Sequence, residues 1–154
     1  MDSTYRFVDR VLEDLITIHQ QAKHPLNMYH IGADETAGAW VKSPICQAFV
    51  ANKANNVPDI KHLSGYFIER ISAMIHAKGI AIGGWNDGLA ETNNQQMPNN
   101  VYSYIWAALP WGAHQQVSKQ ARRNWQIILS IPDVLYFDFP YEIDPKERGY
   151  AWAS

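Results

Sequence analysis

The chain has 154 residues, of which 47% are hydrophobic and 18% charged, a composition typical of a folded globular protein and not of a disordered or fibrous one. The formal net charge is -2 and the basic residues are scattered, so we expect no nucleic-acid partner. No apolar run reaches the roughly 18 residues that cross a bilayer, and we expect no membrane partner.

The single cysteine and the aromatic residues narrow the possibilities further. Cys46 has no second cysteine to pair with, so we expect no disulfide and interpret it as a small apolar side chain. The first residues, MDSTYRF, lack the apolar core of a secretion signal, and the sequence alone predicts no location. Several Trp and Tyr residues directly follow apolar runs, where such rings suit the apolar faces of sugars.

In chain order, the hydrophobic pattern predicts helices alternating with short apolar strands. We expect a helix over residues 4–22, a strand over 26–31, and helices over 40–53 and 60–77, the last followed by Gly79 in a C-cap position. We then expect strands over 80–85, 101–106 and 125–130, a loop over 91–100, a helix over 114–123, and an aromatic-rich loop over 136–141.

This alternation predicts an α/β fold with a parallel sheet and right-handed crossovers. Polar and aromatic residues follow the strands, as they do at the sites of barrels and of doubly wound sheets. The glycine-rich motifs of nucleotide-binding folds are missing from the sequence, which favours a barrel. A complete (β/α)8 barrel takes about 250 residues and eight strands. We therefore predict one domain over residues 1–154 that forms part of such a barrel.

The most informative stretch is HIGADE at residues 30–35, which ends the first predicted strand with two adjacent carboxylates, Asp34 and Glu35. Judged by spacing alone, Asp34 or Thr36 could equally cap the next helix. The stretch resembles the H-x-G-x-D-E signature of family 20 glycoside hydrolases, the β-N-acetylhexosaminidases, and in particular their chitobiase-type members. In that family the D-E pair closes the fourth barrel strand, so the resemblance implies that this chain covers strands four to seven with their helices.

The resemblance also implies a mechanism. Glu35 matches the general acid, which must hold a proton at working pH, as burial and a neighbouring carboxylate favour. Adjacent residues on extended backbone point to opposite sides, so Asp34 is not expected to be the nucleophile of an ordinary retaining pair. The resemblance instead implies attack by the substrate's own acetamido oxygen, with Asp34 orienting the acetamido N–H and Tyr136 holding the acetamido oxygen.

The remaining site residues come from the same resemblance. Asp138 matches a carboxylate that binds sugar hydroxyls, and three tryptophans match the indoles that wall the sugar subsite: Trp85, Trp106 and Trp152. Each of these indoles could by itself be a packing residue. Three other tryptophans have no match and stay as packing or outer-subsite candidates: Trp40, Trp111 and Trp125.

As partners and location, the resemblance implies a small carbohydrate substrate ending in N-acetylglucosamine (GlcNAc), no cofactor, and a periplasmic or secreted protein. His30 lacks partners at metal-ligand spacing, so we expect no metal site. Strand edges left open by a partial barrel favour self-association.

Two other interpretations stay open. The chain could be a truncated fragment that binds carbohydrate, or is inactive, without catalysing hydrolysis. It could also be a different barrel glycosidase, in which Asp87 or Asp138 would have to supply a second carboxylate about 5 to 9 Å from Glu35.

Overall fold

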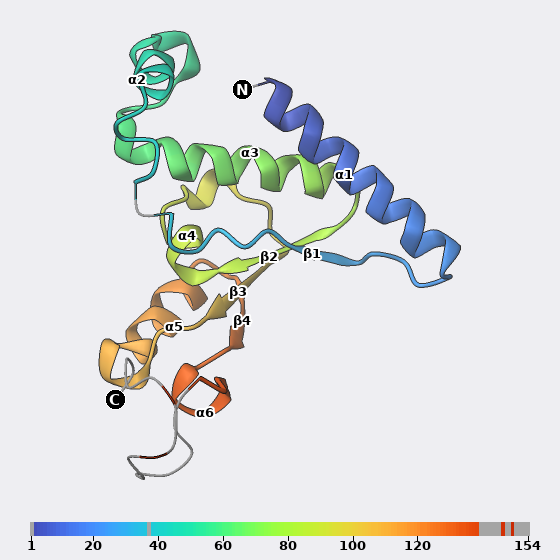
Figure 1. The fold of residues 1–154 in the computed structure, drawn as a ribbon, viewed down its shortest axis with the longest axis vertical. Coiled ribbons are helices and arrows are strands. Elements are labelled where there is room, and N and C mark those ends of the chain that lie inside the picture. The colour runs from blue at the N-terminus through green and yellow to red at the C-terminus, as the bar shows by residue number, and fades with distance from the viewer. Residues whose placement is uncertain (1, 37, 139–145, 147–148, 150–154) are drawn as a thin grey trace.

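The structure, a computed structural model, describes residues 2–36, 38–138, 146 and 149. Within this part of the chain, four parallel strands form one sheet in the order β1-β2-β3-β4 (Figure 1). The strands are β1 Met28–His30, β2 Ala81–Trp85, β3 Val101–Ile105 and β4 Gln126–Leu129. Each strand lies beside the next strand of the chain. A barrel wall has this sequential order, whereas a doubly wound sheet reverses its order at a switch point. The prediction of a partial (β/α)8 barrel is confirmed.

Helices precede or connect the strands. The long ones are α1 Asp2–Gln21, α3 Leu63–Ala77 and α5 Ala113–Ala121. Helix α2, Pro44–Ala51, lies apart from the sheet, beyond the start of α3 (Figure 1). The short helical segments are η1 Lys53–Asn55, η2 Ile60–His62, α4 Asn86–Ala90, η3 Asn94–Gln96, η4 Leu109–Trp111 and α6 Pro132–Leu135. Among the described helices, none combines the length and the hydrophobicity that a membrane span requires.

Two clusters of buried side chains fix the helices to the sheet. The first joins α1, α3 and β2 through Leu12, Ile75 and Ile82, each with 0% exposure. The second joins α4 to β3 through Leu89 and Val101, with further contributions from Ile68, Met97 and Trp125. Full burial of one such branched side chain contributes about 1.5 to 3 kcal/mol. These clusters hold the helices against the sheet, and the site lies at the carboxyl ends of its strands.

The first strand is shorter than the sequence predicts. We expected residues 26–31, but β1 ends at His30. Gly32 and Ala33 then have φ values of +71° and +74°, which an extended strand does not adopt. The helix expected over 40–53 is likewise shortened to α2, where Ser43 caps the first turn and Pro44 opens it.

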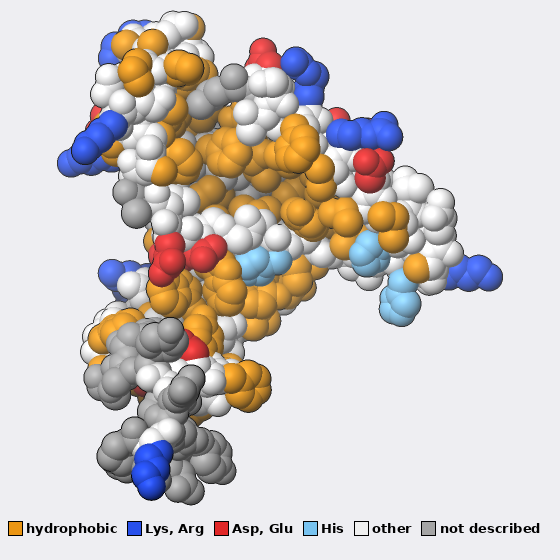
Figure 2. Space-filling model, in the orientation of Figure 1, with side chains coloured by type: hydrophobic (Ala, Val, Ile, Leu, Met, Phe, Trp, Pro, Cys, Tyr) orange, Lys and Arg blue, Asp and Glu red, His pale blue; other side chains and the backbone are white. Residues whose placement is uncertain are grey.

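Both edges of the described sheet carry open or apolar surface. β1 and β4 each have a neighbouring strand on one side within the described residues. Ile128 and Leu129 on β4 are 36% and 53% exposed. Apolar side chains also cover the surface between α1 and α3 (Figure 2), where a hollow of about 340 Å³ includes Tyr29, Phe67 and Trp40 in its lining.

Candidate active site

The two adjacent carboxylates project from a tightly bent loop, residues 31–36, which we call the acid loop. Its backbone has positive φ at Gly32 (+71°), Ala33 (+74°) and Glu35 (+49°). For a residue with a side chain, the left-handed conformation costs about 1 to 2 kcal/mol. The loop therefore needs contacts from outside itself to keep this shape.

Those contacts come from β2 and the helix that follows it. The Ile31 N–H donates to the Gly83 carbonyl at 2.8 Å, and the Trp85 N–H donates to the Gly32 carbonyl at 2.9 Å. Further along the loop, the Glu35 N–H donates to Oδ2 of Asp87 at 2.9 Å. β2 thus fixes the start of the acid loop, and Asp87 of α4 fixes the backbone of Glu35.

Gly88 in α4 allows this close approach. A Cβ atom placed on Gly88 would lie 1.8 Å from the carbonyl oxygen of Ala33, so only glycine fits. The glycine lets the backbone of α4 lie directly against the acid loop.

One pocket collects nearly all of the residues that the sequence proposed. It measures about 540 Å³, and its lining residues are Asp34, Glu35, Trp85, Trp106, Trp111, Tyr136 and Asp138. The other proposed residue, Trp152, lies outside the described residues. Trp111, which the sequence left as a packing or outer-subsite candidate, also lines this pocket. It lies in η4 and is 54% exposed.

Asp34 and Glu35 line the same pocket and are both exposed in this chain. We expected adjacent residues to point to opposite sides. That expectation required extended backbone, and the acid loop is not extended because Ala33 and Glu35 have positive φ. The bend lets both carboxylates serve one site.

Tyr136 lines the same pocket and lies one residue beyond α6. Burial raises the pKa of the Tyr136 phenol, and the negative charges of Asp138, Asp34 and Glu35 raise it further. The phenol therefore stays protonated at neutral pH and can donate a hydrogen bond into the pocket.

His30, at the end of β1, contacts two aromatic residues and the backbone of the acid loop. Its ring contacts Trp85 and Tyr104 edge to face, with centroid distances of 5.1 and 4.6 Å. The Gly32 N–H donates to His30 Nδ1 at 3.1 Å, which requires this nitrogen to be unprotonated. Burial lowers the pKa of His30, against the opposing effect of Asp34. The histidine is therefore a neutral support for the acid loop. In the described part of the chain, no cluster of three His, Cys, Asp or Glu side chains is placed to hold a metal ion.

Asn86 and Asp87 connect β2 to β3; the sequence considered Asp87 only as an alternative second carboxylate and did not single out Asn86. The Trp106 N–H donates to Oδ1 of Asn86 at 3.0 Å, and its indole Nε1–H donates to Oδ1 of Asp87 at 2.9 Å. Since the Glu35 N–H binds the other Asp87 oxygen, both carboxylate oxygens are engaged by donors from this chain. This arrangement argues against Asp87 as the second catalytic carboxylate of an ordinary glycosidase.

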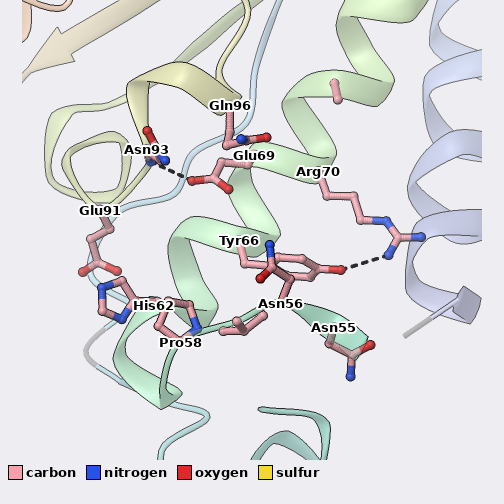
Figure 3. Close-up of a pocket in the computed structure, with 12 residues that line it drawn as sticks. Asn55, Asn56, Pro58, His62, Tyr66, Glu69, Arg70, Glu91, Asn93 and Gln96 are labelled. Atoms are coloured by element: carbon pink, nitrogen blue, oxygen red, sulfur yellow. Dashed lines mark hydrogen bonds between the residues drawn. The ribbon is translucent and has the colours of Figure 1, made fainter. Parts of the chain in front are cut away.

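A second hollow, of about 500 Å³, lies beside α3, between residues 55–58 and the loop that leads to β3 (Figure 3). Several of its polar groups bond to one another. Glu69 accepts the Asn93 N–H at 2.6 Å, and Arg70 donates to the Tyr66 hydroxyl at 3.2 Å (Figure 3). These bonds fasten the loop and the helix, and we interpret this outer hollow as structural.

The fold and the first pocket together define a class. A parallel barrel wall that gathers carboxylates, a phenol and indoles at the carboxyl ends of its strands has the site arrangement of an α/β-barrel enzyme.

Comparison with known proteins identifies the family. The model of the glycosyl hydrolase family 20 catalytic domain matches residues 1–154, and the chain belongs to this family. It is 40% identical over 157 residues to a beta-hexosaminidase of Vibrio vulnificus and 43% identical over 152 residues to beta-hexosaminidase B of Pseudoalteromonas piscicida. These alignments cover 100% and 99% of this chain but 18% and 19% of the relatives, so the chain spans about a fifth of their length.

A solved structure shows the same fold. The exo-β-N-acetylglucosaminidase of Vibrio harveyi, determined in complex with N-acetylglucosamine, superposes with a TM-score of 0.75 and 29% identity. The match covers 97% of this chain and 21% of that enzyme.

Proposed function

We propose that residues 1–154 are a single partial catalytic domain of an exo-β-N-acetylglucosaminidase that releases GlcNAc from chitooligosaccharides. The observation that carries this proposal is the meeting of Asp34, Glu35 and Tyr136 in one indole-lined pocket. A binding site alone would need the indoles but not this acid and phenol. The V. harveyi enzyme, an exo-β-N-acetylglucosaminidase, supports the substrate class.

In the proposed first step, Glu35 donates its proton to the glycosidic oxygen. The acetamido oxygen of the substrate attacks the anomeric carbon as the bond to the leaving group breaks, which gives an oxazolinium intermediate. In the second step, Glu35 takes a proton from water. The water oxygen bonds to the anomeric carbon and opens the oxazolinium ring, so the configuration is retained.

The other residues prepare the substrate for this attack. Asp34 accepts the acetamido N–H and stabilises the positive charge that develops on the intermediate. Tyr136, kept protonated by its raised pKa, donates to the acetamido oxygen and aims it at the anomeric carbon. Asp138 binds sugar hydroxyls. Trp85, Trp106 and Trp152 supply the apolar walls.

We further propose that the chain self-associates through its open sheet edges. Within the described residues, β1 and β4 each pair with a strand on one side alone, and β4 exposes Ile128 and Leu129. Light scattering coupled to size exclusion is expected to give a mass above 17.6 kDa that falls with dilution. A purely monomeric species at all concentrations would contradict this second proposal.

The decisive experiment is hydrolysis of a chromogenic aryl β-N-acetylglucosaminide by the purified chain, beside the same aryl group on plain glucose. Only the acetamido sugar supplies the nucleophile, so we expect turnover of the first substrate alone. Glu35→Gln removes the acid and should abolish that turnover. Glu69→Gln changes a carboxylate of similar size in the outer hollow and should leave it intact.

The other outcomes decide between the alternatives. Equal turnover of the glucoside would indicate an ordinary second carboxylate and overturn the substrate-assisted mechanism. A folded chain that binds GlcNAc without hydrolysing either substrate would be the carbohydrate-binding fragment, and the proposal of catalysis by this chain would fail.

A further inference from the structure

Asp87 occupies a special place among the carboxylates of the chain. It lies in the first turn of α4, at the carboxyl end of β2, and is half-buried. Its two oxygens accept from different segments: Oδ2 from the Glu35 N–H of the acid loop, Oδ1 from the indole Nε1–H of Trp106 beyond β3, both at 2.9 Å. One side chain thus joins the backbone of the proposed acid to a wall of the proposed sugar subsite.

The bond to Glu35 acts on a strained residue. Glu35 has φ +49°, which an L-residue adopts only when its surroundings hold it there. Within the described residues, the Glu35 N–H finds its acceptor in Asp87, and a charged acceptor makes a stronger hydrogen bond than a neutral one. Loss of this bond would let the backbone relax and turn the Glu35 carboxyl away from its working position.

The bond to Trp106 acts on orientation. The indole N–H is a donor with a fixed direction in the ring plane, so an acceptor at 2.9 Å sets the angle at which the ring faces the pocket. The Trp106 backbone is held independently, because its N–H donates to Asn86. A change at Asp87 should therefore move the ring while the backbone stays in place.

We propose that Asp87 is a positioning residue that sets the Glu35 backbone and the Trp106 ring together, so that the acid and the sugar wall keep one mutual geometry. The catalytic consequence rests on the function proposed above. The geometric coupling is a property of the chain that can be observed without substrate.

The test is Asp87→Asn in the full chain labelled with ¹⁵N. An asparagine has one carbonyl oxygen, so it can accept one of the two N–H groups while its own NH₂ opposes the other. We expect the resonance of the Trp106 indole N–H or that of the Glu35 amide to move upfield, and that proton to exchange faster with water. If the new asparagine side chain rotates away from both partners, both resonances should change. Trp106→Phe assigns the indole signal among the six tryptophans.

The matched control is Asp59→Asn. Asp59 also accepts two N–H groups, from Lys61 and His62, but caps η2 away from the pocket. The Asp59→Asn variant should leave the resonances of the Trp106 indole and the Glu35 amide unchanged. If Asp87→Asn moves them no more than this control does, the positioning role is overturned. If Asp87→Asn fails to fold, Trp106→Phe gives the answer: it removes the indole partner of Asp87 Oδ1, so the coupling requires the Glu35 amide resonance to shift, and an unshifted resonance overturns it.

Kinetics separates this inference from the proposed function. In a chain that hydrolyses the aryl substrate, misplacement of the acid by about 1 Å costs on the order of 100-fold, so Asp87→Asn should lower kcat by up to that factor with a smaller change in KM. An unchanged kcat would overturn the role in catalysis. In a chain without turnover the proposed function fails, and the resonances alone decide whether Asp87 couples the two elements.

Discussion

The pocket at the strand ends and the outer hollow beside α3 have nearly the same size, about 540 and 500 Å³, yet their chemistry differs. Beside α3, Glu69 and Arg70 are bonded to Asn93 and Tyr66 of the hollow's own lining. At the strand ends, Asp34 and Glu35 lie exposed on a strained loop whose backbone is held from behind. The difference teaches that the volume of a hollow does not identify a functional site. The exposure of acidic groups to the open space of the pocket is the better indicator.

The largest expected contrast compares two tyrosines, one in each hollow. Tyr136→Phe removes the donor to the acetamido oxygen, and loss of one such donor typically lowers kcat about 100-fold or more. Tyr66→Phe removes a hydroxyl that bonds to Arg70 and should leave kcat unchanged. Steady-state hydrolysis of the aryl substrate measures both. Equal losses would mean that the tyrosines act through folding and not through the site.

The next contrast concerns two glycines. Gly88→Ala forces a Cβ against the Ala33 carbonyl, and overpacking of this kind costs about 1 to 3 kcal/mol or more, here at the upper end because the obstacle is backbone. Gly79→Ala adds a Cβ with no atom within 4 Å and bears only the cost of φ +75°, about 1 to 2 kcal/mol. Urea unfolding gives both values. A larger loss at Gly79 would show that the acid loop yields easily.

A smaller effect is expected in the outer hollow. Glu69→Ala removes the acceptor of the Asn93 N–H and should lower the free energy of unfolding by about 1 kcal/mol. Hydrolysis per folded molecule should not change. A specific loss of hydrolysis would show that the outer hollow is linked to the site.

The smallest effect concerns pH. Burial lowers the pKa of His30 in the folded chain, so between its ordinary value of 6.5 and its folded value the unfolded chain binds more protons. The free energy of unfolding should therefore fall as pH drops through this window, while it is unaffected by His30 above it. NMR titration of the His30 ring measures the folded pKa, and His30→Phe should remove this part of the pH dependence. A folded pKa above 6.5 would reverse the sign.

Much of the architecture could be predicted because the relevant signals are local. The strands over 80–85 and 101–106 are apolar and bounded by turns, and β2 and β3 lie within them. α4 gave no such signal. It has five residues, no side-chain cap, and a glycine at position 88 that usually weakens a helix. That glycine serves tertiary packing against Ala33, which no local pattern reveals.

The site likewise contains residues that the sequence predicts and residues that it does not. Asp34 and Glu35 stand out because they are adjacent carboxylates after an apolar run, and the family resemblance supplied Tyr136. The role of Asp87 was not predictable, because its partner Glu35 is 52 residues away and the contact uses a backbone N–H, which has no sequence signature. The shared pocket of Asp34 and Glu35 was predicted from the resemblance, but the bent backbone behind it was not, since the residue types of Ala33 and Glu35 do not predict a positive φ.

The span of 52 residues between Glu35 and Asp87 has a consequence for the order of folding. During synthesis from the N-terminus, β1 and the acid loop are made well before the segment that holds them. Contacts of such long sequence separation close slowly, since the loss of chain entropy precedes the gain. The geometry of the pocket should accordingly form late, after α3 has folded back and β2 has paired with β1. Until then Asp34 and Glu35 lack the contacts from β2 and Asp87 that hold their loop.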